Sequence, residues 1–165
     1  MPLPLHAAVI TVSDSCFGGT REDRSGPALV RALTAAEFAV VEHLTVSDEV
    51  PQIVAALRQC LRHDGLIVTT GGTGLTARDV TPEATMQVCT RMVPGLAEAM
   101  RRHGEQQTPM AALSRAVCGT VERSLIVNLP GSPAGAVASL STVLGLIPHA
   151  LALLAGQTQH TEPIE

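Results

Sequence analysis

The stretch of the chain that could do chemistry most directly runs from residue 66 to residue 83. An apolar run, Leu66–Thr70, leads into Gly71-Gly72-Thr73-Gly74, and Thr81-Pro82-Glu83 has the residue types of a helix start. A strand, a glycine loop and a helix can together cradle a phosphate, because backbone N–H groups approach its oxygens. Asp79, in the same loop, would repel a phosphate unless a cation lay between them. The stretch therefore indicates a phosphate ester held with Mg²⁺, which prefers phosphate and carboxylate oxygens.

Further candidate ligands follow from the same chemistry. A substrate phosphate is already an anion, so it can attack without a strong general base, and the protein must align phosphates and neutralise their charge. Asp48 and Asp79 are the best carboxylates for holding the metal, and Arg115 is the best fixed cation for a phosphate. The candidate hydroxyl donors are Ser13, Thr73, Ser114 and Ser132.

Hydrophobic periodicity predicts the elements that position these residues. Strands are expected over residues 5–12, 39–46, 66–70, 115–119 and 124–129. Helices are expected from Pro27, over 50–62, 82–92 and 94–103, with a short turn or helix over 108–114 and a closing helix that Pro148 interrupts. The order is mostly β-α-β-α-β-α, followed by a hairpin-like insertion. It predicts an α/β fold with a mostly parallel sheet and helices on both faces.

Three polar or glycine-rich loops follow predicted strands, at residues 13–26, 71–81 and 128–133. The first is expected to have no regular structure, and loops of that length are often functional. The carboxyl ends of parallel strands share one edge of a sheet, where open α/β sheets bind ligands. We therefore expect the three loops to converge there.

Composition narrows the class of protein. A chain of 165 residues with 45% hydrophobic residues is expected to form one domain, 1–165, with a polar, loose tail over 157–165. A net charge of −4 and 1% aromatic residues argue against nucleic-acid binding. No apolar run is long enough to span a membrane, and the start of the chain lacks a signal-peptide pattern. Four widely separated cysteines are typical of a reducing cytoplasm rather than of disulfides or a zinc site.

Five motifs, in order along the chain, resemble those of the molybdopterin adenylyltransferases of the MogA/MoaB type and of the G domain of gephyrin. They are Ser13-Asp14 with Asp23-Arg24-Ser25-Gly26-Pro27, Gly71-Gly72-Thr73-Gly74, Arg78-Asp79-Val80-Thr81-Pro82-Glu83-Ala84, Leu113-Ser114-Arg115 and Asn128-Leu129-Pro130-Gly131-Ser132-Pro133. The resemblance covers residues 6 to 155. It implies a three-layer αβα fold, a homotrimer, and a place in molybdenum cofactor biosynthesis.

The resemblance also implies a reaction and its residues. The terminal phosphate of molybdopterin attacks the α-phosphate of Mg-ATP, pyrophosphate leaves, and the product passes to a molybdate-insertion protein. Asp48 and Asp79 fall on acids that hold Mg-ATP and serve catalysis. Polar substrate-binding positions fall on Ser13, Asp14, Asp23, Thr73, Ser114, Arg115 and Asn128. Nucleotide and phosphate loops fall on Gly71, Gly72, Gly74, Pro130, Gly131 and Ser132.

Two positions depart from the family pattern, and other functions stay open beside the enzyme. Relatives commonly carry Ser where this chain has Gly104, and Lys where it has Ala134. A non-catalytic carrier of molybdopterin is the main alternative hypothesis, followed by a pyrophosphatase-type domain like that of competence-damage proteins. Retention of both Asp48 and Asp79 favours the enzyme.

Overall fold

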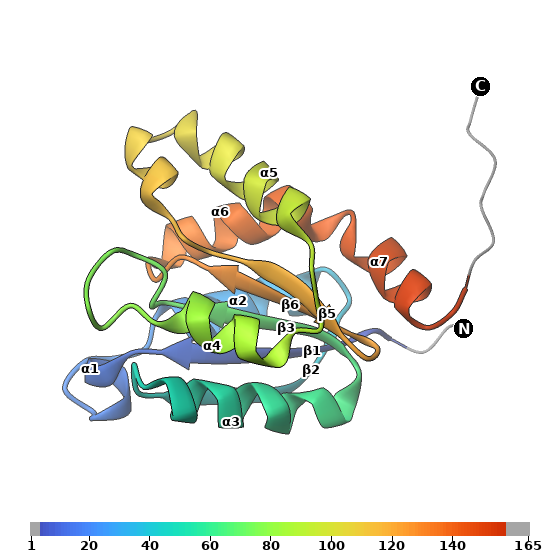
Figure 1. The fold of residues 1–165 in the computed structure, drawn as a ribbon, viewed down its shortest axis with the longest axis horizontal. Helices are drawn as coiled ribbons and strands as arrows, with labels where there is room; N and C mark the ends of the chain where they lie inside the picture. The colour runs from blue at the N-terminus through green and yellow to red at the C-terminus, as the bar shows by residue number, and fades with distance from the viewer. Residues whose placement is uncertain (1–3, 158–165) are drawn as a thin grey trace.

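The computed structural model describes residues 4–157, whose strands form one six-stranded sheet (Figure 1). The strand order is β2 (Ala39–Val46), β1 (His6–Val12), β3 (Gly65–Thr70), β6 (Ser124–Leu129), β5 (Cys118–Val121) and β4 (Arg91–Met92). The first four are parallel, and β5 is antiparallel to both neighbours. The predicted α/β class, with its mostly parallel sheet and hairpin-like insertion, is confirmed.

Alternation along the strands explains why helices cover both faces. Ala7 and Val9 of β1 face one core with α2 (Ser25–Ala35), α5 (Pro94–Glu105), α6 (Pro133–Leu144) and α7 (Ile147–Leu154). Ala8 and Ile10 face the other core, with α3 (Val50–Cys60) and α4 (Thr81–Val88). Successive side chains point to opposite faces, so a strand that is apolar throughout must be covered twice. The result is the three-layer sandwich seen in Figure 1.

The connections between the strands create a crevice at one edge of the sheet. From β1 the chain crosses one face through α2 to β2, and from β2 it crosses the other face through α3 to β3. β2 and β3 therefore flank β1 on opposite sides. At such a switch in direction, the loops after neighbouring strands diverge and leave room for a ligand beyond the carboxyl ends. The segments after β1, β2, β3 and β6 all leave the sheet at this edge.

Four expectations about local structure need correction. The 13–26 loop contains a short helix, α1 (Asp14–Phe17), and α2 begins at Ser25, before Pro27. The helix expected over 82–92 ends at Val88, because the Thr90 N–H donates to the Thr120 carbonyl at 2.9 Å and draws the next residues into the sheet as β4. The strand expected at 115–119 begins only at Cys118.

The closing segment agrees with expectation. The interruption predicted near Pro148 is present, since α6 ends at Leu144 and α7 begins at Ile147. The short turn expected at 108–114 is a 3₁₀ helix, η2 (Pro109–Leu113). Of the tail expected over 157–165, all but Gln157 lies outside the described residues. Between residues 4 and 157 no single helix is long and apolar enough to cross a membrane; α6 and α7, bent by 61°, pass that test only as a pair and only by length and composition.

Candidate active site

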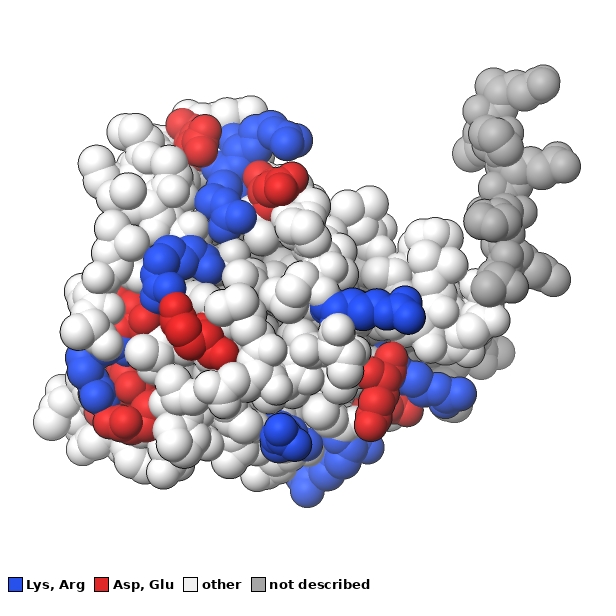
Figure 2. All heavy atoms as spheres, viewed as in Figure 1, with Lys and Arg blue, Asp and Glu red and all other residues white. Residues whose placement is uncertain are grey.

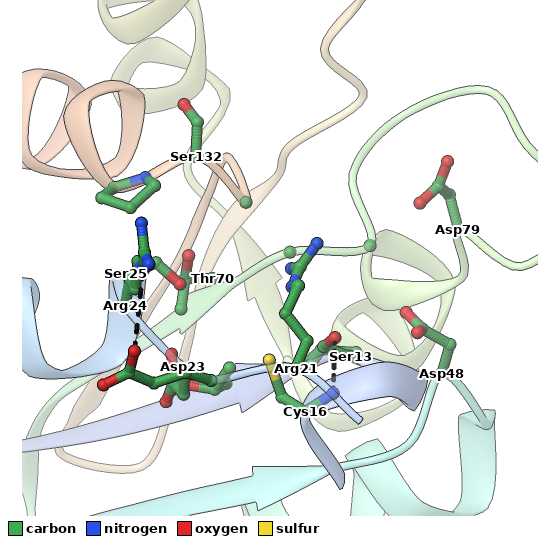
Figure 3. A pocket seen from close by; sticks show the side chains of 17 residues that line it. Ser13, Cys16, Arg21, Asp23, Arg24, Ser25, Asp48, Thr70, Asp79 and Ser132 are labelled. Atoms are coloured by element: carbon green, nitrogen blue, oxygen red, sulfur yellow. Dashed lines mark hydrogen bonds and ion pairs between the residues drawn. The ribbon is translucent and has the colours of Figure 1, made fainter. Parts of the chain in front are cut away.

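A cavity of about 720 Å³ lies at the carboxyl edge of the sheet (Figure 3). Its walls come from the segments after β1, β2, β3 and β6, so the expected convergence of the loops is confirmed. We call it the phosphate cavity. Its lining residues include Thr11, Ser13, Cys16, Arg21, Glu22, Asp23, Arg24, Ser25, Asp48, Thr70, Gly71, Gly72, Asp79, Gly131 and Ser132.

The glycine turn forms the floor of this cavity. Gly71 and Gly72 have φ angles of 99° and 69°, a region that side chains rarely adopt. Thr81, the first residue of α4, fixes the turn from behind: its hydroxyl donates to the Gly71 carbonyl at 2.9 Å, and its N–H donates to the Gly72 carbonyl at 3.0 Å. The turn is thus preformed before any ligand arrives.

Replacing Gly71 with alanine is expected to strain this turn severely. A Cβ there would lie 2.3 Å from the Val12 carbonyl oxygen, a backbone atom that cannot move aside cheaply, and φ is positive as well. We expect the free energy of unfolding to fall by roughly 1–3 kcal/mol. Urea unfolding measures it, with Gly145→Ala as the control, because nothing lies within 4 Å of a Cβ at Gly145. Equal stability of the two variants would contradict the preformed turn.

The two predicted metal carboxylates both line the phosphate cavity. Asp48 follows β2, Asp79 follows the glycine turn, and Figure 3 shows their carboxylates on the same side of the cavity. In each, one oxygen is held by the protein. Asp48 Oδ2 accepts the Asp14 N–H at 2.8 Å, and Asp79 Oδ2 accepts the N–H and hydroxyl of Thr76 at 2.9 and 2.8 Å. The other oxygen of each has no hydrogen-bond donor among residues 4–157.

This donor set fits Mg²⁺ shared with substrate phosphates. Within residues 4–157, no group of three or more His, Cys, Asp or Glu side chains gathers as a complete metal site. Mg²⁺ is commonly bound by one or two carboxylates plus phosphate oxygens and water. Burial raises the pKa of the Asp48 carboxyl above its usual value; the Asp14 N–H opposes this, while the negative charges of Asp14 and Asp79 add to it. A cation at the pair would relieve that repulsion.

Two predicted site residues, Asp14 and Arg115, have their side chains engaged by the protein and do not line the phosphate cavity. Asp14 binds Arg78 and the Asp48 N–H. Arg115 was expected to bind a phosphate. Instead it donates to the Gly74 and Asp79 carbonyls at 2.8 and 2.7 Å and pairs with Glu83. The structure therefore gives Arg115 the role of a clamp on the glycine loop.

Asn128 is also engaged internally, although it lies at the wall of a second cavity. Its side chain is fully buried. Its oxygen accepts the Val117 N–H at 3.2 Å, and its nitrogen donates to the hydroxyls of Thr69 and Thr85 at 3.0 and 2.9 Å. It joins β6 to β3 and α4 rather than offering a free polar group to a substrate.

The second cavity, of about 340 Å³, adjoins the phosphate cavity at Ser132. It collects the predicted residues Thr73, Gly74, Ser114, Asn128, Pro130 and Ser132, together with apolar side chains from α5, η2 and α6. We call it the ring cavity. Gly104 also lines it, and a Cβ there would lie 2.8 Å from the Ala111 Cβ. The close approach of α5 and η2 therefore favours glycine at this position.

The remaining predicted residues, Ser13, Asp23 and Ser132, line the phosphate cavity and fix the segments around it. Ser13 and Ser132 cap α1 and α6, accepting the Cys16 and Gly135 N–H groups at 3.2 Å each. Asp23 accepts the Thr11 hydroxyl at 2.7 Å and the Gly26 N–H at 2.9 Å, which fixes the start of α2. These side chains thus shape the cavity as well as line it.

Arg21 also lines the phosphate cavity, although no sequence pattern predicted it there. Figure 3 shows its guanidinium reaching into the middle of the phosphate cavity, between Ser132 and Asp48. In the described chain this side chain has no ion pair or hydrogen bond. Every basic residue of this lysine-free chain is an arginine, and on the face shown in Figure 2 they are dispersed rather than gathered in one patch. The other arginine in the lining, Arg24, is 78% exposed and lies 3.7 Å from Glu22.

Comparisons with known proteins show the family of this chain. Residues 8–149 match the family model described as a probable molybdopterin binding domain. The chain is 39% identical to the molybdopterin adenylyltransferase of Helicobacter pylori (strain J99), over 92% of this chain and 89% of that protein. It is 40% identical to a molybdenum cofactor biosynthesis bifunctional protein of Synechococcus elongatus, over 95% of this chain. The chain spans about half the length (50%) of that bifunctional relative.

A solved structure is similar over nearly the whole fold. It is the molybdopterin biosynthesis enzyme MoaB of Thermus thermophilus, which superimposes with a TM-score of 0.85 at 49% identity. The match covers 92% of this chain and 97% of that one.

Proposed function

Because this chain belongs to the family of molybdopterin-binding domains, we propose that it is a molybdopterin adenylyltransferase that acts in molybdenum cofactor biosynthesis. The observation that carries the proposal is the carboxylate pair Asp48 and Asp79, which faces a preformed glycine turn in a cavity with a free arginine. That arrangement suits the joining of two phosphates. In the reaction, an oxygen of the molybdopterin phosphate bonds to the α-phosphorus of ATP. The bond from that phosphorus to the bridging oxygen breaks, and pyrophosphate leaves with the electron pair.

The protein's own part in this step is alignment. Asp48 and Asp79 would hold Mg²⁺, which when bound neutralises phosphate charge. The glycine turn and the Gly131–Ser132 loop both line the phosphate cavity, where backbone N–H groups of such loops can bind phosphate oxygens. No side chain has to remove a proton, because the attacking phosphate oxygen is already anionic, so positioning and charge supply the catalysis.

In this proposal, the two cavities bind different parts of the substrates. Both molybdopterin and ATP carry a ring system at one end and phosphate at the other. The ring cavity, with its apolar wall from α5 and η2, takes one flat heterocycle. The phosphates then meet next to Ser132, the residue that both cavities share. The second heterocycle lies against the loop after β1.

Arg21 supplies the cation for the triphosphate in this proposal. We expect Arg21→Ala to raise the KM for ATP about 10- to 100-fold, the cost of one charge-assisted hydrogen bond, with a smaller effect on kcat. Arg58→Ala is the control, since Arg58 is exposed on α3 and lies outside both cavities, and we expect a change of less than about 3-fold. Steady-state pyrophosphate release at varied ATP measures both. Equal KM values for ATP in the two variants would show that Arg21 does not bind ATP.

Assembly and location are further parts of the proposal. We propose a homotrimer in the cytoplasm, with the adenylylated product handed to a molybdate-insertion protein. The resemblance to the MogA/MoaB and gephyrin proteins supports these three statements. Sedimentation equilibrium tests the homotrimer, and a stable monomer would contradict it.

A carrier that binds molybdopterin without reacting is the alternative, and one assay separates the two. Purified protein is mixed with Mg-ATP, and pyrophosphate is followed before and after molybdopterin is added. We expect release only after the addition. Tight binding of molybdopterin by folded protein, with no pyrophosphate, would leave the carrier as the function.

A further inference from the structure

Arg78, just before Asp79, lies in a dense set of ion pairs that the reaction does not use. Its Nε and Nη2 each donate to the Asp14 carboxylate at 3.0 Å, a two-pronged contact. Its Nη1 donates to Glu49 at 2.9 Å. All three guanidinium nitrogens therefore face carboxylates, and the charge of Arg78 is already neutralised.

Asp14 is in turn hydrogen-bonded to Asp48. The Asp14 N–H donates to Asp48 Oδ2 at 2.8 Å, and the Asp48 N–H donates to Asp14 Oδ1 at 3.0 Å. This reciprocal pair joins the segment after β1 to the segment after β2. A continuous path of hydrogen bonds therefore runs from Arg78, through Asp14, to the carboxylate of Asp48.

The path ties the glycine loop to the rest of the site. Among residues 4–157, the contacts of Arg78 are the only hydrogen bonds or ion pairs between residues 74–79 and the segments after β1 and β2. The other hydrogen bonds of Asp79 stay within its own loop, at Thr76, or lead to Arg115 on the opposite side. Without Arg78, the segment that carries Asp79 would have no bond to the segment that carries Asp48.

We propose that Arg78 is a positioning residue, which sets the spacing of the Asp48 and Asp79 carboxylates through its contact with Asp14. The proposal rests on the proposed function in one respect, that the two carboxylates share a metal ion. Arg78 itself touches no substrate: in the described chain it lines neither the phosphate cavity nor the ring cavity. Residues that orient metal ligands in this way act through geometry, and replacing them weakens metal binding while the fold persists.

The experiment compares three variants with the wild type. Arg78→Ala removes the path, and Arg78→Lys keeps a charge but cannot bond both oxygens of Asp14 and Glu49 at once. Arg58→Ala is the control, because Arg58 is exposed on the outer surface of α3 and forms no ion pair or hydrogen bond among the described residues. The readouts are Mn²⁺ affinity by electron paramagnetic resonance, with and without ATP, and hydrogen exchange of peptides that cover residues 72–80.

We expect Arg78→Ala to bind Mn²⁺ about 10- to 100-fold more weakly than wild type, with faster exchange at 72–80 and an unchanged melting temperature. Arg78→Lys should recover part of the affinity. In pyrophosphate release, kcat should fall with metal affinity while the KM for molybdopterin stays constant. Asp14→Asn should reproduce the metal effect, and the double variant should be no worse than either single variant, because both act on one path.

Metal binding and exchange need no molybdopterin, so they decide this inference whether or not adenylyl transfer occurs. Wild-type Mn²⁺ affinity and wild-type exchange in Arg78→Ala would overturn it. A wild-type protein that binds no Mn²⁺ would overturn it too, since no shared metal would then depend on the spacing. A wild-type protein that binds Mn²⁺ but releases no pyrophosphate would instead count against the proposed function alone.

Discussion

Asp79→Asn is expected to lower kcat for pyrophosphate release by about 100- to 1,000-fold, the range observed when a fixed electrostatic group is lost from an active site. The amide keeps an oxygen that can accept the Thr76 N–H and hydroxyl, so the loop should keep its shape. What is lost is a negative charge beside the phosphates. The metal-dependent step should therefore fail while the melting temperature stays constant.

Asp64→Asn is the matched control for this variant. Asp64 is exposed at the opposite edge of the sheet, before β3, and lies outside both cavities. Asparagine has nearly the same size and shape as aspartate, so the backbone at this position, with a φ of 46° and a ψ of 139°, should be retained. If the two variants retained similar kcat values, Asp79 would have no catalytic role.

Asp48→Asn is expected to separate activity from stability. We expect kcat to fall by about 100-fold or more, since Asp48 is the second carboxylate that we propose to hold the metal. Burial raises the pKa of this carboxyl above 3.8. The folded-state pKa is higher than the unfolded-state pKa, so folding favours the protonated form of Asp48. This contribution to stability is lost as the pH rises through the folded-state pKa. At pH 7 the metal-free variant should therefore melt at the same temperature as the wild type or higher.

The same pKa sets the pH dependence of metal binding. Mg²⁺ binds the ionised carboxylate, so its affinity should rise as the pH increases through the Asp48 pKa, and binding at a pH close to that pKa should release protons. Titration calorimetry in buffers of different ionisation enthalpy measures that proton. Asp48→Asn should abolish the release, and an unchanged release in the variant would place the titrating group elsewhere.

Local pattern was enough to predict the scaffold. The β3 run and the glycines after it have the residue types of a buried strand and a phosphate turn, and β1 and β6 carry apolar residues on both faces. A strand that is buried on both faces must be covered by helices, so the layers follow from the sequence. The end of α4 did not follow, because the pairing of Thr90 with Thr120, 30 residues later, overrides helix propensity there.

Side-chain roles in the site were harder to predict than residue types. Asp14 and Arg115 have side chains that could bind a substrate, but both side chains instead bind residues of this chain that are far away in sequence. Asp14 pairs with Arg78, 64 positions later, and Arg115 binds Gly74, 41 positions earlier. No local spacing encodes such pairs.

Arg21 was missed for the converse reason. An arginine in a polar loop has the sequence signature of any exposed residue. Only the fold brings its guanidinium opposite Asp48 across the phosphate cavity (Figure 3). The signal that could have pointed to it is the absence of lysine, which leaves arginine as the only fully cationic side chain available for a phosphate.

Following the α-phosphorus of ATP tests adenylyl transfer most directly. ATP labelled at that atom is incubated with Mg²⁺, molybdopterin and the protein, and the labelled products are identified by mass spectrometry. We expect the label in a product with the mass of molybdopterin plus AMP less one water, formed only when molybdopterin is present and scarcely formed by Asp79→Asn. Label that stays in ATP or appears as free AMP, with folded protein that binds molybdopterin, would contradict the account.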